Sequence, residues 1–249
     1  MLSLPEPVAL RAIREEFSVE IARDGDALLE AYRLRHQVYC LERKFEPTQP
    51  GVDIETDEFD ERTRHVLIRS RSDDQVVGTV RLILPDLDAP ELSFPMQRVC
   101  APGLLNRLPI SETAEVSRFA LSKVRRAESC ASLGLLRLSL VQGLVMLSRE
   151  VGVTHWCAMM EPTLLRLLRM TSIHFRPLGS LVDHHGLRQP AYNSVDEIFG
   201  RMFEEQPSAW NFITDGGRLW PAPNMVSSSY SAQVANSGSQ AYAAMEMAG

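Results

Sequence analysis

The sequence lacks the signatures of several common protein classes. Its four cysteines lie far apart, so no CxxC-type metal-binding knuckle exists. The chain has 26 lysine and arginine residues against 32 aspartate and glutamate residues, which gives a net charge of −6. A dedicated nucleic-acid-binding protein usually has a basic surplus, so this balance argues against one. A local basic patch for a phosphorylated partner remains compatible with the sequence.

The chain also lacks a long apolar run. The most apolar stretch, residues 133–147, is shorter than the ~20 residues that a membrane span requires, and Arg137 and Gln142 interrupt it. No signal peptide precedes the cysteines (Cys40, Cys100, Cys130 and Cys157), so we expect reduced core thiols in a cytoplasmic protein without a transmembrane segment.

Strand and helix patterns alternate through most of the 249 residues. The predicted strands cover residues 17–22, 65–69, 76–84, 113–122 and 153–159, with short candidates at 173–177 and 191–194. The predicted helices cover residues 27–43, 125–151, 161–170 and 195–203. The pattern indicates one α/β (α+β) domain over residues 17–206, an N-terminal extension over 1–16, and a C-terminal tail over 207–249, largely disordered from about residue 226.

Charged residues inside these predicted elements form the most informative pattern. Residues 32–35 read YRLR inside the helix predicted over residues 27–43, and Tyr39 follows in the same helix. Residues 55–60 read ETDEFD in a loop, residues 77–82 read VGTVRL in a strand, and residues 114–119 read AEVSRF in another strand. Each piece alone is weak, because an isolated helical arginine or an acidic loop is usually solvated. An EF-hand calcium loop is disfavoured, since Glu58 stands where such a loop needs glycine.

Together, in this order, the four segments resemble the acyl-homoserine lactone (autoinducer) synthases and N-acyl amino acid synthases of the GNAT-like superfamily. Residues 155–162 (HWCAMMEP) and 182–188 (VDHHGLR) are most similar to one branch, the acyltransferase associated with PEP-CTERM/exosortase systems. The resemblance covers about residues 17–200. It implies a GNAT-like fold, with a central mixed, mostly antiparallel sheet splayed at the fourth strand and flanked by helices.

The resemblance also implies roles for individual residues. The residues implied to bind the acyl acceptor are Arg35, Tyr39, Phe45, Asp57, Asp60 and Arg81. The residues implied to act in catalysis are Glu115, Ser117 and Arg118. Taken together, the charged members of these two sets have three positive and three negative charges, which suits a zwitterionic acceptor and demands pairing wherever they are buried.

In a regular strand Glu115 and Arg118 point to opposite faces, so they can share a cleft only if the strand is irregular. We therefore predict a β-bulge in this strand. An attacking amine must lose a proton, and Glu115 is the candidate base, although it can instead serve only to anchor Arg118. Ser117 can contact the acceptor or the leaving thiol, or bond only to backbone.

The residues implied to bind the acyl donor or its carrier protein are Lys123, Arg125 and Arg126. The resemblance to GNAT-like proteins implies that a helix begins after the fourth strand and that its N-terminus binds the pantetheine phosphate. The usual glycine-rich signature is absent, since residues 124–134 read VRRAESCASLG. This favours an acyl carrier protein as partner and donor over acyl-CoA, with the basic residues meeting its acidic surface. No tightly bound cofactor is expected.

Three functions stay open at the level of the sequence. The first is transfer of a fatty acyl group to a small amine acceptor, an amino acid or a related metabolite. The second is lactone synthesis from S-adenosylmethionine, and the third is a non-catalytic module that binds an acyl carrier protein. No metal site is expected, because His184 and His185, as neighbours in a strand, would face opposite ways. The oligomeric state is not predicted.

Overall fold

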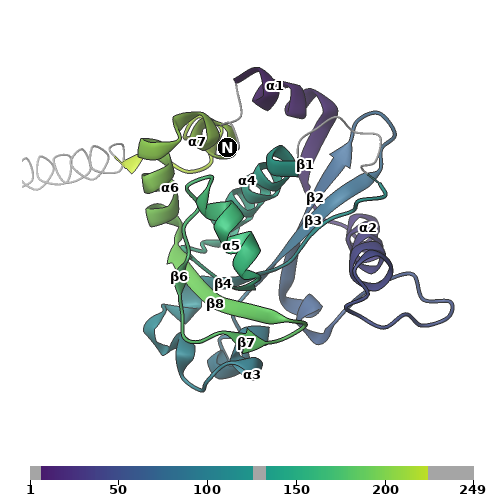
Figure 1. The fold of residues 1–249 in the computed structure, drawn as a ribbon, viewed down its shortest axis with the longest axis vertical. Helices are drawn as coiled ribbons and strands as arrows, with labels where there is room; N and C mark the ends of the chain where they lie inside the picture. The colour runs from purple at the N-terminus through teal and green to yellow at the C-terminus, as the bar shows by residue number, and fades with distance from the viewer. Residues whose placement is uncertain (1–6, 126–132, 224–249) are drawn as a thin grey trace, which may run out of the picture.

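An eight-stranded sheet with helices on both faces forms the centre of the molecule (Figure 1). The computed structural model describes residues 7–125 and 133–223. The strands are β1 (Phe17–Ile21), β2 (Thr63–Ser70), β3 (Val76–Ile83), β4 (Thr113–Leu121), β5 (His155–Met160), β6 (Arg176–Pro177), β7 (Val182–Asp183) and β8 (Leu187–Ser194). The α-helices are α1 (Pro7–Glu16), α2 (Gly25–Arg35), α3 (Pro95–Val99), α4 (Leu133–Val151), α5 (Pro162–Arg169), α6 (Val195–Glu205) and α7 (Pro207–Thr214).

The strand order is β1-β2-β3-β4-β5-β8-β6, with β7 beside β8. Every neighbouring pair is antiparallel except β4 and β5, which run parallel. The predicted fold class, a mixed and mostly antiparallel sheet flanked by helices, is therefore confirmed. None of the helices in the described part of the chain is long and apolar enough to cross a membrane.

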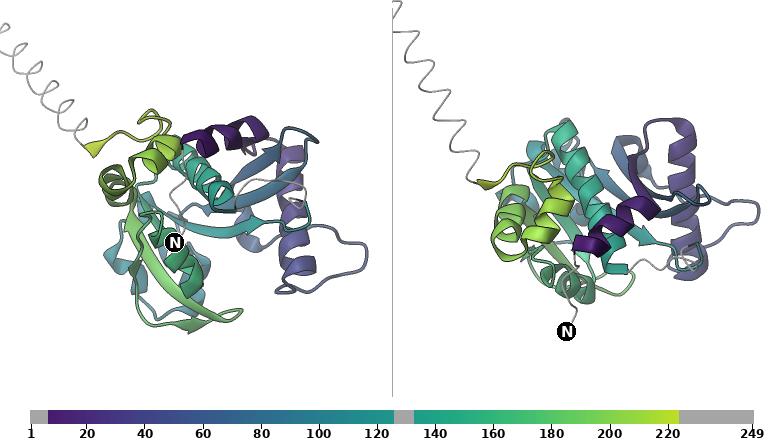
Figure 2. Two further views of the ribbon diagram at one scale, coloured as in Figure 1. Left: turned by 45° about the horizontal axis from the view of Figure 1, so that its top comes forward. Right: turned by 90° about the horizontal axis from the view of Figure 1, so that it is seen from above.

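The two faces of the sheet are covered by different helices (Figure 2). Along β2, Val66 and Ile68 belong to the large core under α4, whereas Leu67 belongs to the smaller core under α2. This is the alternation that a strand buried on both faces requires. The helix α4 approaches closely, because a Cβ at Gly143 would lie 2.2 Å from a methyl carbon of Val66.

Both ends of the described chain are packed against α4, which differs from the expectation for residues 1–16 and 207–249. In α1, Leu10 and Ile13 are buried one helical turn apart. In α7, Trp210 and Phe212 join the same core. The apolar residues of these short segments were too few to give a clear helical period. The predicted disorder beyond residue 226 lies outside the described residues.

The predicted helix over residues 27–43 begins as α2 and continues as a π-helix, His36–Glu42, labelled η1. Its N-cap is Asp24, whose carboxylate accepts from the Ala27 N–H. The helix predicted over residues 125–151 is described from Leu133 onward. The short helix α3 and the strand β7 were not predicted, because neither is long enough to show a period.

The sheet is splayed at β4, as predicted. Residues Thr113–Glu115 of β4 pair with His155–Cys157 of β5, and no further pair joins the two strands among the described residues. On its other side β4 pairs with β3, but the register shifts so that Arg118 and Phe119 lie opposite Val80 alone. The predicted β-bulge is therefore present, and it begins at Arg118.

Candidate active site

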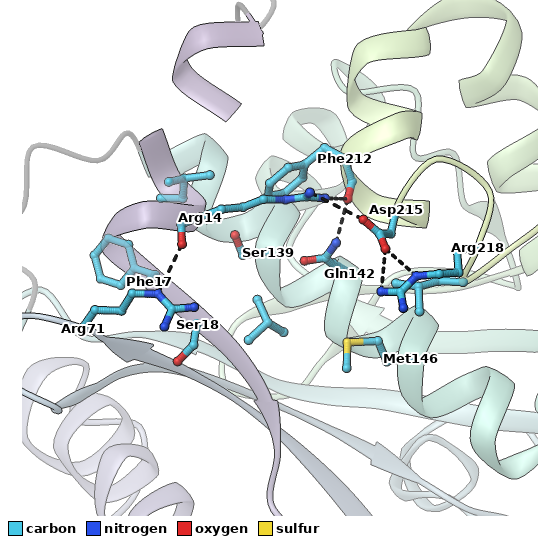
Figure 3. A pocket seen from close by; sticks show the side chains of 13 residues that line it. Arg14, Phe17, Ser18, Arg71, Ser139, Gln142, Met146, Phe212, Asp215 and Arg218 are labelled. Carbon is cyan, nitrogen blue, oxygen red and sulfur yellow. Dashed lines mark hydrogen bonds and ion pairs between the residues drawn. The ribbon is translucent and has the colours of Figure 1, made fainter. Parts of the chain in front are cut away.

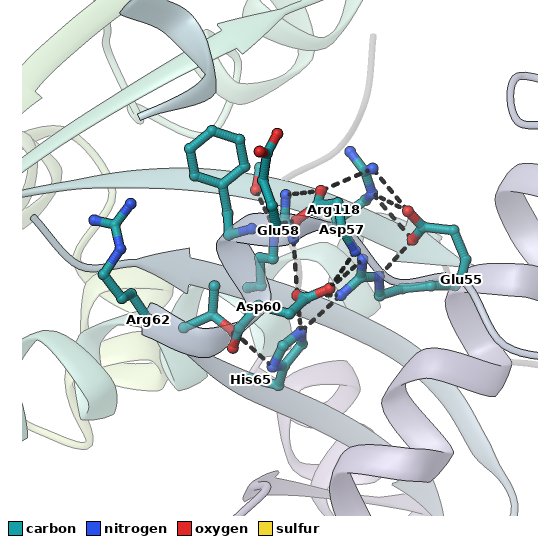
Figure 4. A network of polar contacts seen from close by, with 12 residues as sticks. Glu55, Asp57, Glu58, Asp60, Arg62, His65 and Arg118 are labelled. Atoms are coloured by element: carbon teal, nitrogen blue, oxygen red, sulfur yellow. Dashed lines mark hydrogen bonds and ion pairs between the residues drawn. The ribbon is translucent and has the colours of Figure 1, made fainter. Parts of the chain in front are cut away.

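Three arginines from three elements meet three carboxylates from one loop (Figure 4). We call these six residues the charged cluster. The arginines are Arg35 at the end of α2, Arg81 on β3 and Arg118 on β4, and the carboxylates are Glu55, Asp57 and Asp60. The side chains of Arg35 and Arg81 are completely buried. Buried guanidinium groups must be paired and hydrogen-bonded, and both are.

Arg35 lies between two carboxylates. Its Nε donates to Glu55 Oε2 at 2.5 Å, and its Nη1 and Nη2 donate to the two oxygens of Asp60 at 2.6 and 3.0 Å. Burial acts to raise the pKa of Glu55 and of Asp60. The hydrogen bonds and positive charge of the arginines outweigh it and lower the pKa of each carboxyl to about 2. Both groups are therefore ionised at neutral pH.

The spacing of Asp57 and Asp60 follows from a local turn. Asp57 is the N-cap of a 3₁₀-helix, Glu58–Arg62, and its carboxylate accepts from the Phe59 N–H at 3.0 Å. The Asp60 carboxylate accepts in return from the Asp57 N–H at 2.8 Å, which completes a capping box. Both carboxylates then face Arg81, which donates to Asp57 at 2.7 Å and to Asp60 at 2.8 Å.

The bulge brings Ser117 and Arg118 to the same cluster, although consecutive residues of a regular strand face opposite ways. Arg81 Nε donates to Ser117 Oγ at 2.8 Å. Arg118, at φ 51°, donates to Glu55 at 2.7 Å and to Asp57 at 3.2 Å. Its guanidinium also lies over the ring of Tyr39, 5.3 Å from the centroid. The side chains of Arg118 and Asp57 are 20% and 25% exposed, so the cluster opens toward solvent on this side.

Glu115 stands apart from the cluster, which corrects the expectation that it is one of the paired charges. It is 2% exposed, and its Oε2 accepts from the Met96 N–H at 3.0 Å. Burial raises the pKa of Glu115 to about 7. Arg118 pairs with Glu55 and Asp57 instead, so the contacts do not support a role of Glu115 as its anchor. The third negative charge of the cluster is Glu55.

Sequence reasoning missed Glu55 and His65 as site residues. Glu55 was visible as the first acidic residue of the motif over residues 55–60, but it was not assigned a role in the site. His65 is completely buried on β2, and its Nε2 lies 3.1 Å from Arg35 Nη1. Burial, and then the charge of Arg35, lower the pKa of His65 to about 3, so the ring is neutral and can accept from the guanidinium.

Tyr39 and Phe45, which were expected to bind the acceptor, lie at the open side of the cluster. Tyr39 is on η1 beneath Arg118, as described above. Phe45 lies on the loop after η1, beside Glu46, whose Oε1 is 3.8 Å from Arg118 Nη2. The ring of Phe45 faces His185 across 6.1 Å. We call the space bordered by these side chains the mouth of the site.

The segment after β4, where the donor residues are expected, is held by local hydrogen bonds. The carboxylate of Glu42 accepts from Ser122 Oγ at 2.6 Å and from the Lys123 N–H at 2.9 Å. Arg125 donates from Nη1 to the Val76 carbonyl at 3.1 Å, so its side chain is partly buried against β3 rather than free at the surface. Lys123 is exposed. Arg126 lies outside the described residues.

The two histidines at positions 184 and 185 are not on a regular strand, which corrects the expectation that they face opposite ways. They form the turn between β7 and β8, and their rings meet edge to face with centroids 4.6 Å apart. Residues 7–125 and 133–223 contain no group of three or more His, Cys, Asp or Glu side chains that could hold a metal ion.

A separate cavity of about 260 Å³ lies on the α4 side of the sheet (Figure 3). Its charged groups are paired locally. Arg14 donates to the Phe212 carbonyl at 3.0 Å, and Arg218 donates to Asp215 at 2.6 Å. Gln142 of α4 donates to the same carbonyl of Phe212 at 2.7 Å. These contacts join α1, α4 and α7, so they hold the ends of the described chain to the core.

The splayed, mostly antiparallel sheet flanked by helices matches the GNAT-like fold. Residues 34–135 match the family model described as "Acetyltransferase (GNAT) domain". The match includes the whole charged cluster and Glu115. No curated protein matches the chain in sequence.

Solved structures of acyl transfer enzymes share the fold. FeeM, an N-acyl amino acid synthase from uncultured soil microbes, has a TM-score of 0.58 and 17% identity, and the alignment covers 76% of this chain and 96% of FeeM. The acyl-homoserine lactone synthase LasI has a TM-score of 0.58 and 20% identity, with 75% and 92% covered. BjaI, a CoA-dependent acyl-homoserine lactone synthase solved with SAM and isopentyl-CoA, has a TM-score of 0.53 and 21% identity, with 83% and 90% covered.

Proposed function

We propose that the protein is an N-acyltransferase that moves a fatty acyl group from a thioester donor to the amine of a small acceptor, an amino acid or a related metabolite. The observation that carries this proposal is the end of β4–β5 pairing at Glu115, a buried carboxyl whose pKa is raised by burial to about 7. A base is most effective when its pKa lies near the working pH. Glu115 therefore has the property needed to take a proton from an ammonium group at neutral pH.

The reaction proceeds by direct attack. Glu115 accepts one proton from the acceptor ammonium, directly or through a water. The free amine attacks the thioester carbonyl, the C–S bond breaks, and the proton that the nitrogen then loses passes through Ser117 Oγ to the departing sulfur, so that an amide and a free thiol form. Backbone N–H groups of the splayed strand are positioned to stabilise the oxyanion that forms on the carbonyl. Ser117 Oγ already accepts from Arg81, so its own proton is free to donate to the leaving sulfur.

The charged cluster binds the acceptor at its open side. Arg118 and Asp57 are the two members that are partly exposed, and they offer opposite charges beside each other. A zwitterion has the complementary pair, an ammonium and a carboxylate. The buried members, Arg35, Asp60 and Arg81, are satisfied by one another, so they hold Arg118 and Asp57 in place rather than contact the acceptor.

The donor in this proposal is an acyl carrier protein. The Glu42 carboxylate occupies the backbone N–H of Lys123 at the turn after β4, and its negative charge repels the several phosphate groups of free CoA more strongly than the single phosphodiester of a carrier-bound pantetheine. Lys123 remains exposed there to meet an acidic partner surface. BjaI is CoA-dependent by its description, so acyl-CoA is the alternative donor.

Lactone synthesis from S-adenosylmethionine is the second candidate. It is favoured by the equal TM-scores, 0.58, of FeeM and LasI against this chain. The amino acid part of S-adenosylmethionine also presents an ammonium and a carboxylate, so the same open side of the cluster suits it. We also propose that the protein belongs to the branch associated with PEP-CTERM/exosortase systems, on the basis of its sequence motifs. We further propose a cytoplasmic location, on the basis of the free thiols of Cys40, Cys100 and Cys157.

The experiment is thiol release from acyl carrier proteins and acyl-CoAs of several chain lengths, with pooled amino acids or with S-adenosylmethionine, and products identified by mass spectrometry. Release that requires an amino acid and is lost in Glu115→Gln supports the first candidate. Release with S-adenosylmethionine alone supports the second. No product with any pair contradicts both. Glu150→Gln, at an exposed pair with Arg23, is the matched control.

A further inference from the structure

The motif over residues 182–188 has no role in the site described so far, yet it forms the tip of a hairpin that reaches the mouth. Between β7 and β8 the chain turns through His185 at φ 52° and Gly186 at φ 93°. The turn is closed by a hydrogen bond from the His184 N–H to the Gly186 carbonyl at 3.0 Å. Arg188 then donates to the His185 carbonyl at 2.8 Å, which holds the tip in its conformation.

The hairpin tip contacts the loop that follows η1. The rings of His185 and Phe45 face each other at an interplanar angle of 28°, with centroids 6.1 Å apart. His185 Nε2 lies 3.6 Å from Glu46 Oε1, the same oxygen that is 3.8 Å from Arg118 Nη2. His185 therefore touches both loop residues that border the mouth.

A second set of contacts joins the hairpin to the same loop through Glu161 and two arginines. Glu161, at the end of β5, lies 3.0 Å from Arg188 Nη1 and 3.5 Å from Arg43 Nη1. The guanidinium carbons of Arg188 and Arg43 lie 5.8 and 5.6 Å from the centroid of the Phe45 ring. Phe45 is thus surrounded by residues of the hairpin, of β5 and of its own loop.

These contacts join the two sides of the split sheet. The loop with Phe45 follows α2 and η1, and α2 packs against β2, β3 and β4. The hairpin and Glu161 belong to the side formed by β5 and β8. Because β4 and β5 separate after Glu115, the contact of Phe45 with His185 closes the open end of the split. We call this contact the clasp.

Backbone strain is concentrated at the mouth. Among the described residues other than glycine, six have a positive φ, and three of these are Lys44, Arg118 and His185. They come from three separate segments: the loop, the bulge of β4 and the hairpin tip. A left-handed conformation is unfavourable for such residues and persists where the surroundings require it, which is most often at a functional site.

We propose that His185 is a positioning residue for acceptor binding, which acts by holding Phe45 and Glu46 over the open side of the charged cluster. The inference rests on the proposed function, since it assigns the mouth to the acceptor. His185 contacts neither Glu115 nor Ser117, so it affects the affinity for the acceptor and not the chemical step.

The test compares His185→Ala with His185→Phe, which keeps the stacked ring, and with His174→Ala, a histidine that pairs with Glu205 away from the mouth. We expect His185→Ala to raise the KM for the acceptor about three- to tenfold, the size expected for loss of one aromatic pair. The kcat and the KM for the donor stay unchanged, and His185→Phe restores most of the affinity. An unchanged acceptor KM, an equal change in His174→Ala, or a fall in kcat alone overturns the proposal.

A second measurement does not depend on turnover. Hydrogen–deuterium exchange of the full chain should be faster in His185→Ala both at residues 182–188 and, across the split, at residues 43–46. Unchanged exchange at residues 43–46 overturns the clasp. A wild-type chain that transfers no acyl group with any donor and acceptor contradicts the proposed function, and the clasp is then decided by the exchange result.

Discussion

The Oε2 atom of Glu115 accepts a hydrogen bond from the backbone N–H of Met96 at 3.0 Å, and that is the contact that holds this carboxyl in a buried position. A single hydrogen bond from a neutral donor does not compensate for the loss of hydration of a full negative charge. The carboxyl is therefore held at a pKa of about 7, between its protonated and ionised forms at neutral pH. Glu55 and Asp60 of the charged cluster, by contrast, are ionised and paired with arginines.

The raised pKa of Glu115 predicts a pH-dependent stability. Its folded-state pKa of about 7 exceeds the ordinary value of 4.5, so the folded protein binds the proton more tightly than the unfolded chain. Stability should therefore fall as pH rises from about 4.5 to 7 and then level off, by at most about 3 kcal/mol from this group. In Glu115→Gln this part of the pH dependence should disappear, as measured by urea unfolding between pH 5 and 8.

The same residue predicts the pH profile of the reaction. If Glu115 is the base, kcat/KM should rise with pH up to about 7 and then become constant. Glu115→Gln should lower kcat by roughly 10²- to 10⁴-fold, the usual contribution of a general base. An active Glu115→Gln variant with an unaltered profile would show that another group takes the proton.

The pairing of Asp60 with two buried arginines predicts a large effect on stability. The Asp60 carboxylate lies 2.6 Å from Arg35 Nη1 and 2.8 Å from Arg81 Nη1. Asp60→Asn therefore removes one negatively charged partner from each of these arginines. Loss of one member of a buried ion pair typically costs about 3–5 kcal/mol. Denaturant unfolding at pH 7 should show that the free energy of unfolding decreases by this amount. Glu150→Gln, which breaks the exposed pair with Arg23, should change stability by less than about 1 kcal/mol.

The bulge at Arg118 allows the backbone and the side chain to be tested separately. Arg118 has φ 51°, a conformation that glycine adopts without a steric penalty. Arg118→Gly and Arg118→Ala remove the same guanidinium, so both should lose acceptor binding. Arg118→Gly should nevertheless be more stable than Arg118→Ala by about 1 kcal/mol. Equal stability of the two variants would mean that the bulge relaxes once the side chain is gone.

The position of Glu42 predicts a change in donor preference. Its carboxylate accepts from Ser122 Oγ and from the Lys123 N–H, and it repels a phosphate placed there. Glu42→Ala should therefore bind free CoA about three- to tenfold more tightly, the gain expected from removing one nearby negative charge at the protein surface. Isothermal titration calorimetry measures this directly. Weaker or unchanged binding of CoA would show that the donor phosphate binds elsewhere.

Much of this molecule was predictable from local patterns. The strands predicted over residues 65–69 and 76–84, which form β2 and β3, and the spacing of three residues between Asp57 and Asp60 are properties of neighbouring residues. Sequence periodicity reports such short-range features, because side-chain direction follows from the backbone repeat. The bulge was predictable too, because Glu115 and Arg118 were expected to share one cleft and a regular strand would point them to opposite faces. The ends of the core were less predictable, because α1 and α7 are too short for their pattern to be distinctive.

The amino-acid sequence by itself determined which charged and aromatic residues are available and at what spacing, and with it the class of fold. Only the tertiary structure decided which carboxylate completes the cluster and which stays alone. Glu55 pairs with Arg118, 63 residues away, while Glu115 is left with a backbone partner. The physical reason is that ion pairing and burial depend on distances between distant segments, and the splay of β4 from β5 sets those distances. The contact of His185 with Phe45 exists for the same reason.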